Sequence, residues 1–189
     1  MIRAALLGLA LSAGPLFAQE VMIEDGGPGY PPKMGEISGV LGKQAMAWET
    51  FDFSIGAFDA SAWVNAYEGS VKLSLMGYPP GQPEVMAGRV LITADMGKAL
   101  KKRGKSSKVE VEIYRDEDRD AARLSSAGQS ARLKITRLKL APGAASGYGA
   151  IEGEVTARLC PIEWQEQSCQ HFSARFKTQL QFDGEIPVK

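Results

Sequence analysis

The sequence predicts an all-β fold on the strength of three observations. Runs of alternating apolar and polar residues recur along most of the chain, Gly- and Pro-rich breaks separate them, and two long runs near the C-terminus match each other as a hairpin. Because successive side chains of a strand point to opposite faces, such alternation indicates strands with one buried and one solvent-facing side. We expect about nine strands in an antiparallel β-sandwich, with a partly closed β-barrel as the alternative.

The C-terminal hairpin is the most specific part of this prediction. Its arms, 151–160 and 169–182, alternate so that Cys160 and Cys169 fall together on the polar face. If these two residues are opposed, the other polar-face pairs follow, and they combine opposite charges with a Thr–Ser pair, as antiparallel ladders favour. These pairs are Arg158 with His171, Thr156 with Ser173, Glu154 with Arg175 and Glu152 with Lys177.

The inward face of the same hairpin is apolar. Gly153 would lie opposite Phe176, an arrangement in which an aromatic ring covers a strand glycine. One register therefore satisfies the apolar alternation, the charges and the cysteines together. The apolar residues expected on this face are Ile151, Val155, Ala157, Leu159, Phe172, Ala174, Phe176, Leu180 and Phe182.

Shorter β-patterned runs precede the hairpin. In the last of them, Leu133 and Ile135 are out of phase with Leu138 and Leu140, so that either the strand passes between two layers or a β-bulge near 136–137 resets its face. The expected strands cover 35–41, 44–53, 61–67, 70–76, 89–94, 108–114 and 131–140.

One short helix is also expected between two of these strands. Asp95 can cap its first turn, Met96 and Leu100 are four residues apart and would share a face, and Gly104 can end it. This helix would cover only about two turns.

The N-terminus has the pattern of a secretory signal peptide. Residues 1–18 combine a positive charge at Arg3, an apolar stretch and a small residue, Ala18, before the expected cleavage point. Residues 19–34 form a Gly- and Pro-rich leader, and 35–189 would form a single β domain. We therefore expect a periplasmic or secreted protein of a bacterial envelope, with no transmembrane segment in the mature chain.

Export gives the two cysteines a structural role. Cys160 and Cys169 are the only cysteines, and in an oxidising compartment they should form a disulfide that stabilises the fold by about 2–3 kcal/mol. Their spacing is not that of a Cys-x-x-Cys redox or zinc pair.

The acidic turn at 115–120 begins like a calcium loop but has Ala121 and Ala127 where glycine and glutamate are needed. The sequence predicts no metal site and no cofactor.

Two features are candidates for binding. A basic run could meet an anionic lipid or glycan, although lysines also protect sheet edges from aggregation. Trp164, inside the loop closed by the two cysteines, could anchor a partner if exposed. Trp48, Phe51, Phe53 and Trp63 are expected mainly in the core, and the alternative is that some aromatic residues line a groove for a sugar, a lipid or a quinone tail. The basic run consists of Lys98, Lys101, Lys102, Arg103, Lys105 and Lys108.

Catalysis has little support in the sequence. His171 is the only histidine, its parity places it on the polar face beside Arg158, and the chain has no nucleophile elbow, zinc-protease motif or phosphate loop. Balanced charge, with 22 basic and 22 acidic residues, also disfavours nucleic acid as a partner.

The function predicted from sequence is a non-catalytic binding or interaction module, whose partner is an envelope protein or another envelope component. The alternatives are a carrier for a small apolar ligand between the sheets and a protein that attaches to anionic envelope lipid or glycan through the basic run. A hydrolase of unfamiliar type is the remaining enzymatic alternative.

Overall fold

The structure is a computed structural model that describes residues 31–53, 60–106, 108–115, 123–140, 146–162 and 168–189. The predicted signal peptide, most of the leader, the acidic turn and Trp164 lie outside these residues. Within them the fold is all-β, as predicted, with eleven strands and no helix. The strands are β1 (Lys33–Leu41), β2 (Gln44–Phe51), β3 (Ala62–Tyr67), β4 (Ser70–Gly77), β5 (Val90–Asp95), β6 (Gly104–Ser106), β7 (Val109–Tyr114), β8 (Arg123–Ser125), β9 (Ala131–Lys139), β10 (Ser146–Pro161) and β11 (Gln170–Asp183).

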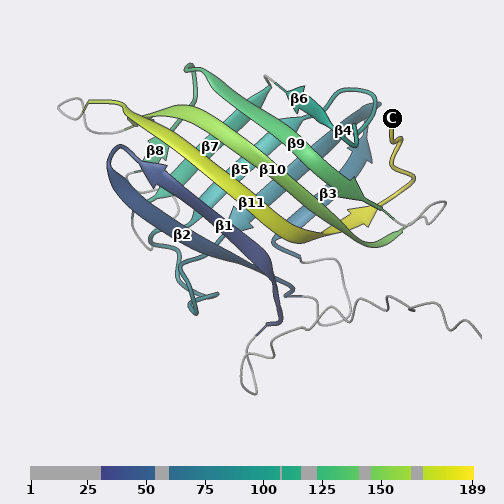
Figure 1. Ribbon diagram of the computed structural model, residues 1–189, viewed down its shortest axis with the longest axis horizontal. Helices are drawn as coiled ribbons and strands as arrows, with labels where there is room; N and C mark the ends of the chain where they lie inside the picture. The colour runs from purple at the N-terminus through teal and green to yellow at the C-terminus, as the bar shows by residue number, and fades with distance from the viewer. Residues whose placement is uncertain (1–30, 54–59, 107, 116–122, 141–145, 163–167) are drawn as a thin grey trace, which may run out of the picture.

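All eleven strands belong to one hydrogen-bonded sheet. Their order is β2-β1-β11-β3-β4-β5-β7-β8-β10-β9-β6, and β10 pairs additionally with β11. Figure 1 shows β9, β10, β11 and β1 in front of β3, β4, β5 and β7, whose strands cross them. The expectation of purely antiparallel pairing is wrong at one place, because β3 runs parallel to the end of β11, with Val64 opposite Phe182.

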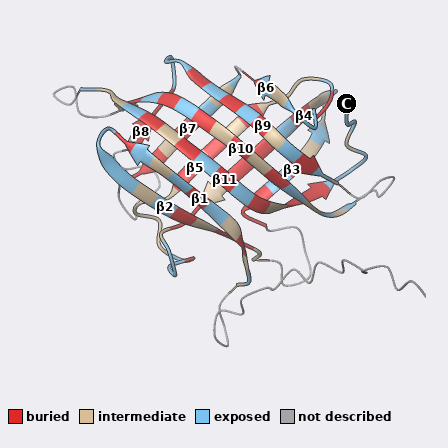
Figure 2. Ribbon diagram, in the orientation of Figure 1, coloured by how far each residue is buried: buried red, intermediate tan, exposed pale blue. Residues whose placement is uncertain are grey.

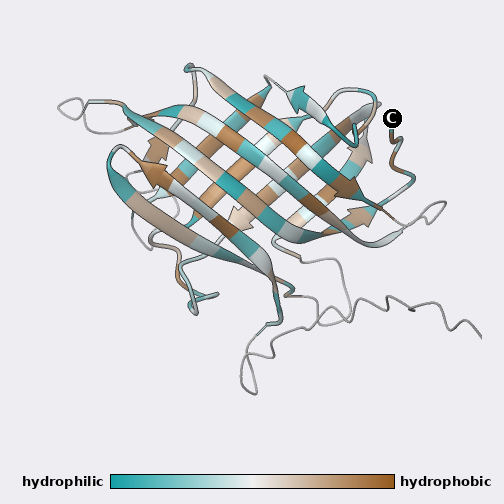
Figure 3. Ribbon diagram, viewed as in Figure 1, coloured by the Kyte–Doolittle hydropathy of each residue, from teal (hydrophilic) through white to brown (hydrophobic). Residues whose placement is uncertain are grey.

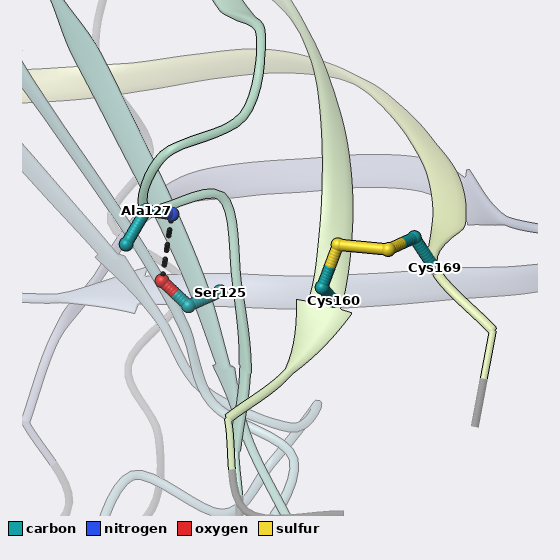
Figure 4. Close-up of a disulfide and its surroundings, with 4 residues drawn as sticks. All are labelled: Ser125, Ala127, Cys160 and Cys169. Carbon is teal, nitrogen blue, oxygen red and sulfur yellow. Dashed lines mark hydrogen bonds between the residues drawn. A yellow bond between two sulfur atoms is a disulfide. The ribbon is translucent and has the colours of Figure 1, made fainter. Parts of the chain in front are cut away.

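The hairpin of β10 and β11 has the predicted register. Arg158 lies opposite His171, Glu154 opposite Arg175 and Gly153 opposite Phe176. A disulfide joins Cys160 to Cys169, whose Cα atoms are 4.1 Å apart, and thereby links the end of β10 to the start of β11 (Figure 4). The paired end is supported on its other side by β8, because Cys160 also pairs with Ser125.

The inward face of the hairpin is buried as expected. Figure 2 shows buried and exposed residues alternating along β9, β10 and β11, and Figure 3 shows the matching alternation of apolar and polar residues. The core that these strands share with the opposite layer includes the fully buried side chains of Trp48, Phe172 and Phe182, and the ring of Trp48 contacts that of Phe172 edge-on. Burial of such large apolar groups is the main source of stability in a fold of this size.

The irregular strand β9 contains a β-bulge at the predicted position. Its pairing with β10 shifts between Ile135, opposite Gly153, and Arg137, opposite Glu152, so that Thr136 is the extra residue. The shift lets Ile135 and Leu138 both face the core, although they are three positions apart. The bulge therefore resolves the phase change seen in the sequence.

The predicted short helix is wrong. Asp95 ends β5 and its side chain accepts a hydrogen bond from the backbone N–H of Gly97, at 2.8 Å, in a tight turn. The capping side chain thus closes a turn in which Gly97 has a positive φ of 73°, and no helical turn follows in the described residues. Leu100, expected on the helix face, is instead fully buried and bridges to Val188 near the C-terminus.

Two short strands were not predicted. β6 and β8 are three residues long, which is too short to show an alternating pattern in the sequence. Both complete the pairing of longer strands: β6 covers the edge of β9, and β8 connects β7 to β10. The described part of the chain contains no helix with the length and apolar character needed to cross a membrane.

Gly153 provides a test of the packing. A Cβ atom there would lie 2.4 Å from Cζ of Phe176 and 2.6 Å from the carbonyl oxygen of Lys134, both closer than any real contact. Gly153→Ala should therefore lower the free energy of unfolding by about 1–3 kcal/mol, measured by urea denaturation. Ala150→Ser, at an exposed position of the same strand, is the control and should change it by no more than about 0.5 kcal/mol. Equal stability of the two variants would contradict the close contact with Phe176.

Candidate ligand-binding groove

A row of outward-facing residues crosses four neighbouring strands. Trp63 on β3 lies opposite Ser74 on β4, Ser74 opposite Thr93 on β5, and Thr93 opposite Glu110 on β7. Their neighbours along each strand point into the core, because Leu73, Ala94 and Val111 are buried there. The same alternation that builds the core therefore places an indole, two hydroxyls and a carboxylate in one line on the outer face.

These residues line a groove of about 630 Å³. The far wall is the turn that follows β8, which is fixed to β7 by two hydrogen bonds. The backbone N–H of Ser126 donates to the carbonyl oxygen of Val111 at 2.9 Å, and the N–H of Val111 donates to Oγ of Ser126 at 2.8 Å. Gln129 on this turn also lines the groove and adds an amide to its polar groups.

Trp63 is the aromatic residue of the groove. Its side chain is 37 % exposed, whereas Trp48, Phe51 and Tyr78 are buried. The expectation of a core position holds for Trp48 and Phe51 and is wrong for Trp63, because Trp63 alternates with the buried Ala62 and Val64. An exposed indole on a rigid strand offers a flat apolar surface to a ligand.

Asp95 carries the main charged contacts at one end of the groove. Its carboxylate accepts hydrogen bonds from Oγ of Ser70, from the N–H of Gly97 at 2.8 Å and from Nζ of Lys72 at 2.9 Å. The Ser70 hydrogen bond, followed by that of Lys72, holds the pKa of Asp95 well below its usual range. Asp95 is therefore a fixed anion and is unsuited to donate a proton at neutral pH.

The predicted basic run is exposed at all six positions but is divided by the fold. Lys108 lines the groove, with Nζ 3.9 Å from a carboxylate oxygen of Asp95. Lys101, Lys102 and Arg103 lie in the connection to β6, where the N–H of Lys102 bonds to the carbonyl oxygen of the C-terminal Lys189. On β6 itself Lys105 lies opposite Lys134 of β9, which pairs with Glu154 at 3.5 Å.

The other predicted site residues are placed as follows. Trp164 lies outside the described residues. His171 is exposed on the outer face opposite Arg158, as the hairpin register predicts. Among the residues described, no group of three or more His, Cys, Asp or Glu side chains is arranged to hold a metal ion.

Sequence reasoning missed Ser74, Thr93 and Glu110 as groove residues. Each is an ordinary polar position of an alternating strand, and only the pairing of β4, β5 and β7 brings them into line with Trp63. The signal available in the sequence was that Trp63 lies between the apolar Ala62 and Val64, so its side chain should point to the opposite face of the strand from theirs. Comparison with protein-family models, with curated proteins and with solved structures found no match to this chain.

Asp95 gives a prediction about pH. Because its pKa is lower in the folded protein than in the unfolded chain, where it is about 4, the carboxylate stabilises the fold above that pH, and the stabilisation is lost as the pH falls toward the folded value. The unfolding free energy of Asp95→Asn should therefore fall less steeply than that of the wild type between about pH 5 and pH 2. Urea titrations at several pH values measure the slope. Glu185→Gln, which removes an exposed carboxylate, is the control, and an Asp95→Asn slope equal to that of the wild type would contradict the assigned contacts.

Proposed function

We propose that the protein is an exported, non-catalytic binding module that holds a polyhydroxylated ligand, such as a segment of an envelope glycan, in the groove over β3, β4, β5 and β7. The observation that carries this proposal is the row of Trp63, Ser74, Thr93 and Glu110 along the groove, in which Trp63 and Glu110 are exposed, Thr93 is half-buried and Ser74 is buried. The predicted signal peptide and the disulfide between Cys160 and Cys169 support export to an oxidising compartment.

The chemistry of the row matches that of a sugar. A pyranose ring has an apolar C–H face that can pack on the exposed indole of Trp63, and its hydroxyls both donate and accept hydrogen bonds. The hydroxyls of Ser74 and Thr93 can do either, while the carboxylate of Glu110 accepts and the amide of Gln129 does both. A mostly fixed surface with a few well-placed polar groups is typical of ligand sites.

The state of Asp95 supports binding without hydrolysis. A glycosidase uses a pair of carboxyl groups, one of them a proton donor with a raised pKa. Here Asp95 has the opposite shift, because Ser70, Gly97 and Lys72 all donate to it. Release of new reducing ends from a bound glycan would contradict this part of the proposal.

The sheet itself is best interpreted as a partly closed barrel rather than a sandwich. The pairing path from β11 through β3, β4, β5, β7 and β8 to β10 returns to β11. The alternative function, a carrier for an apolar ligand, would use the space inside this path. The buried side chains of Phe172 and Phe182, both on β11, are part of the core along this path, which favours the groove.

Trp63 is the residue whose removal tests the proposal. We expect the mature protein to bind members of a glycan array, and Trp63→Ala to weaken that binding about tenfold or more in a subsequent calorimetric titration. Tyr148→Ala, which removes an exposed aromatic of β10 that does not line the groove, should bind like the wild type. The proposal fails if no glycan binds, or if both variants bind as tightly as the unchanged protein.

Attachment to an anionic surface is the second candidate, and the exposure of the whole basic run favours it. Vesicles rich in phosphatidylglycerol should then retain the protein at low salt and release it at about 0.5 M salt, where the Debye length is below about 5 Å. Charge reversal at Lys101, Lys102 and Arg103 should abolish retention. Reversal at Lys43, Arg175 and Lys177 is the matched control, and equal losses in both triple variants would show an effect of net charge alone.

A further inference from the structure

A second hollow, of about 520 Å³, opens on the outer face of β9, β10 and β11 at the disulfide end of the hairpin. It lies on a different set of strands from the groove of the proposed function. Three side chains that can donate hydrogen bonds, from three adjacent strands, line it: Arg132 on β9, Arg158 on β10 and His171 on β11. All three are exposed at its surface.

The register of the strands fixes where these side chains stand. Arg132 lies opposite Thr156, and Arg158 lies opposite His171 one outward position further along β10. The N–H of Arg158 donates to the carbonyl oxygen of Ser130 at 3.0 Å, which ties the start of β9 to β10. The two guanidinium groups are thus carried by paired strands rather than by loops, and this reduces the ordering that binding would require.

Among the described residues that line the hollow, none is Asp or Glu. Glu154 is the outward-facing residue of β10 next to Thr156. Its carboxylate already forms ion pairs with Lys134, at 3.5 Å, and with Arg175, at 3.6 Å. The ion pairs of the described residues include neither Arg132 nor Arg158. Two arginines on neighbouring strands, with no ion-pair partner among the described residues, leave a local excess of positive potential.

A third hollow, of about 390 Å³, differs in that acids are among its lining residues. It lies toward the other end of the hairpin, where Glu36 and Glu152 line it together with Lys33, Arg137, Lys139 and Lys177. Arg137 pairs there with Glu152 at 3.3 Å. The hollow beside the disulfide, by contrast, has no acid among its described lining residues.

We propose that the hollow between Arg132, Arg158 and His171 binds a phosphoryl group. The planar fork of an arginine donates two parallel hydrogen bonds to a phosphate, and two such forks supply four donors. The hydroxyls of Ser130 and Thr156 and the amide of Gln170, which also line the hollow, provide further neutral donors. The shared chemistry is a phosphate oxyanion, whether free or esterified to a sugar.

We expect the disulfide to hold the strand ends of this site in place. Cys169 lines the hollow, and its bond to Cys160 closes the hairpin next to Arg158 and His171. Reduction should leave most of the sheet paired but loosen the strand ends that carry these two side chains. The affinity for phosphate should therefore be lower in the reduced protein than in the oxidised protein.

The test is calorimetric titration of the mature protein, at low salt, with inorganic phosphate, with glucose 6-phosphate and with glucose. We expect both phosphates to bind and glucose not to bind at this site. The double variant Arg132→Gln/Arg158→Gln should weaken phosphate binding about tenfold or more. The double variant Lys139→Gln/Lys177→Gln removes the same charge from exposed positions of the third hollow and should bind phosphate like the wild type. A thermal unfolding curve for each variant confirms that it is folded.

Each outcome decides the proposal. Tighter binding of glucose 6-phosphate than of inorganic phosphate identifies an ester ligand, and the reverse order identifies free phosphate; both support the site. Absence of phosphate binding up to about 10 mM overturns it. Equal weakening by the two double variants also overturns it, because general electrostatic attraction then accounts for the binding. Failure of the glycan groove would leave this result unaffected, since Trp63 takes no part in it.

Discussion

The pairing of β11 is the constraint on which the rest of the structure depends. This strand is hydrogen-bonded to β10 along its length, to β1 on its other side and, at its end, to β3. Its inward residues include Phe172, Phe176 and Leu180, each buried. A slip of one residue against β10 would turn all of them to solvent, at a cost of about 1.5–3 kcal/mol for each side chain. The register is therefore fixed by burial, and the disulfide closes a hairpin that the core already specifies.

Both candidate sites are consequences of the same alternation. Because Leu73, Ala94 and Val111 point into the core, their strand neighbours Ser74, Thr93 and Glu110 lie on the other face of the sheet and align across β4, β5 and β7. The hollow beside the disulfide arises in the same way from the outward residues of β9, β10 and β11. In each case paired strands hold the side chains, so a ligand would meet a surface that is largely formed before binding.

The parts of the fold that could be predicted from the sequence are the local and periodic ones. The hairpin register, its buried face and the bulge at Thr136 follow from alternation within a continuous stretch of chain. The parallel contact of Val64 with Phe182 joins segments far apart in the sequence, and no local pattern encodes it. Asp95 could cap either a helix or a turn, and the choice is made by Gly97 and by the burial of Leu100 against the C-terminal segment. The groove was missed for the same reason, because strand neighbours rather than sequence neighbours create it.

Residue-resolved amide hydrogen exchange of the oxidised protein tests the role of β11 most directly. If the other strands depend on this pairing, the amides of β10 and β11 that face each other, such as those near Thr156 and Ser173, should exchange last and only through global unfolding. The short strands β6 and β8 should exchange earlier through local opening. Exchange of β10 and β11 as fast as that of β6 and β8 would contradict the account.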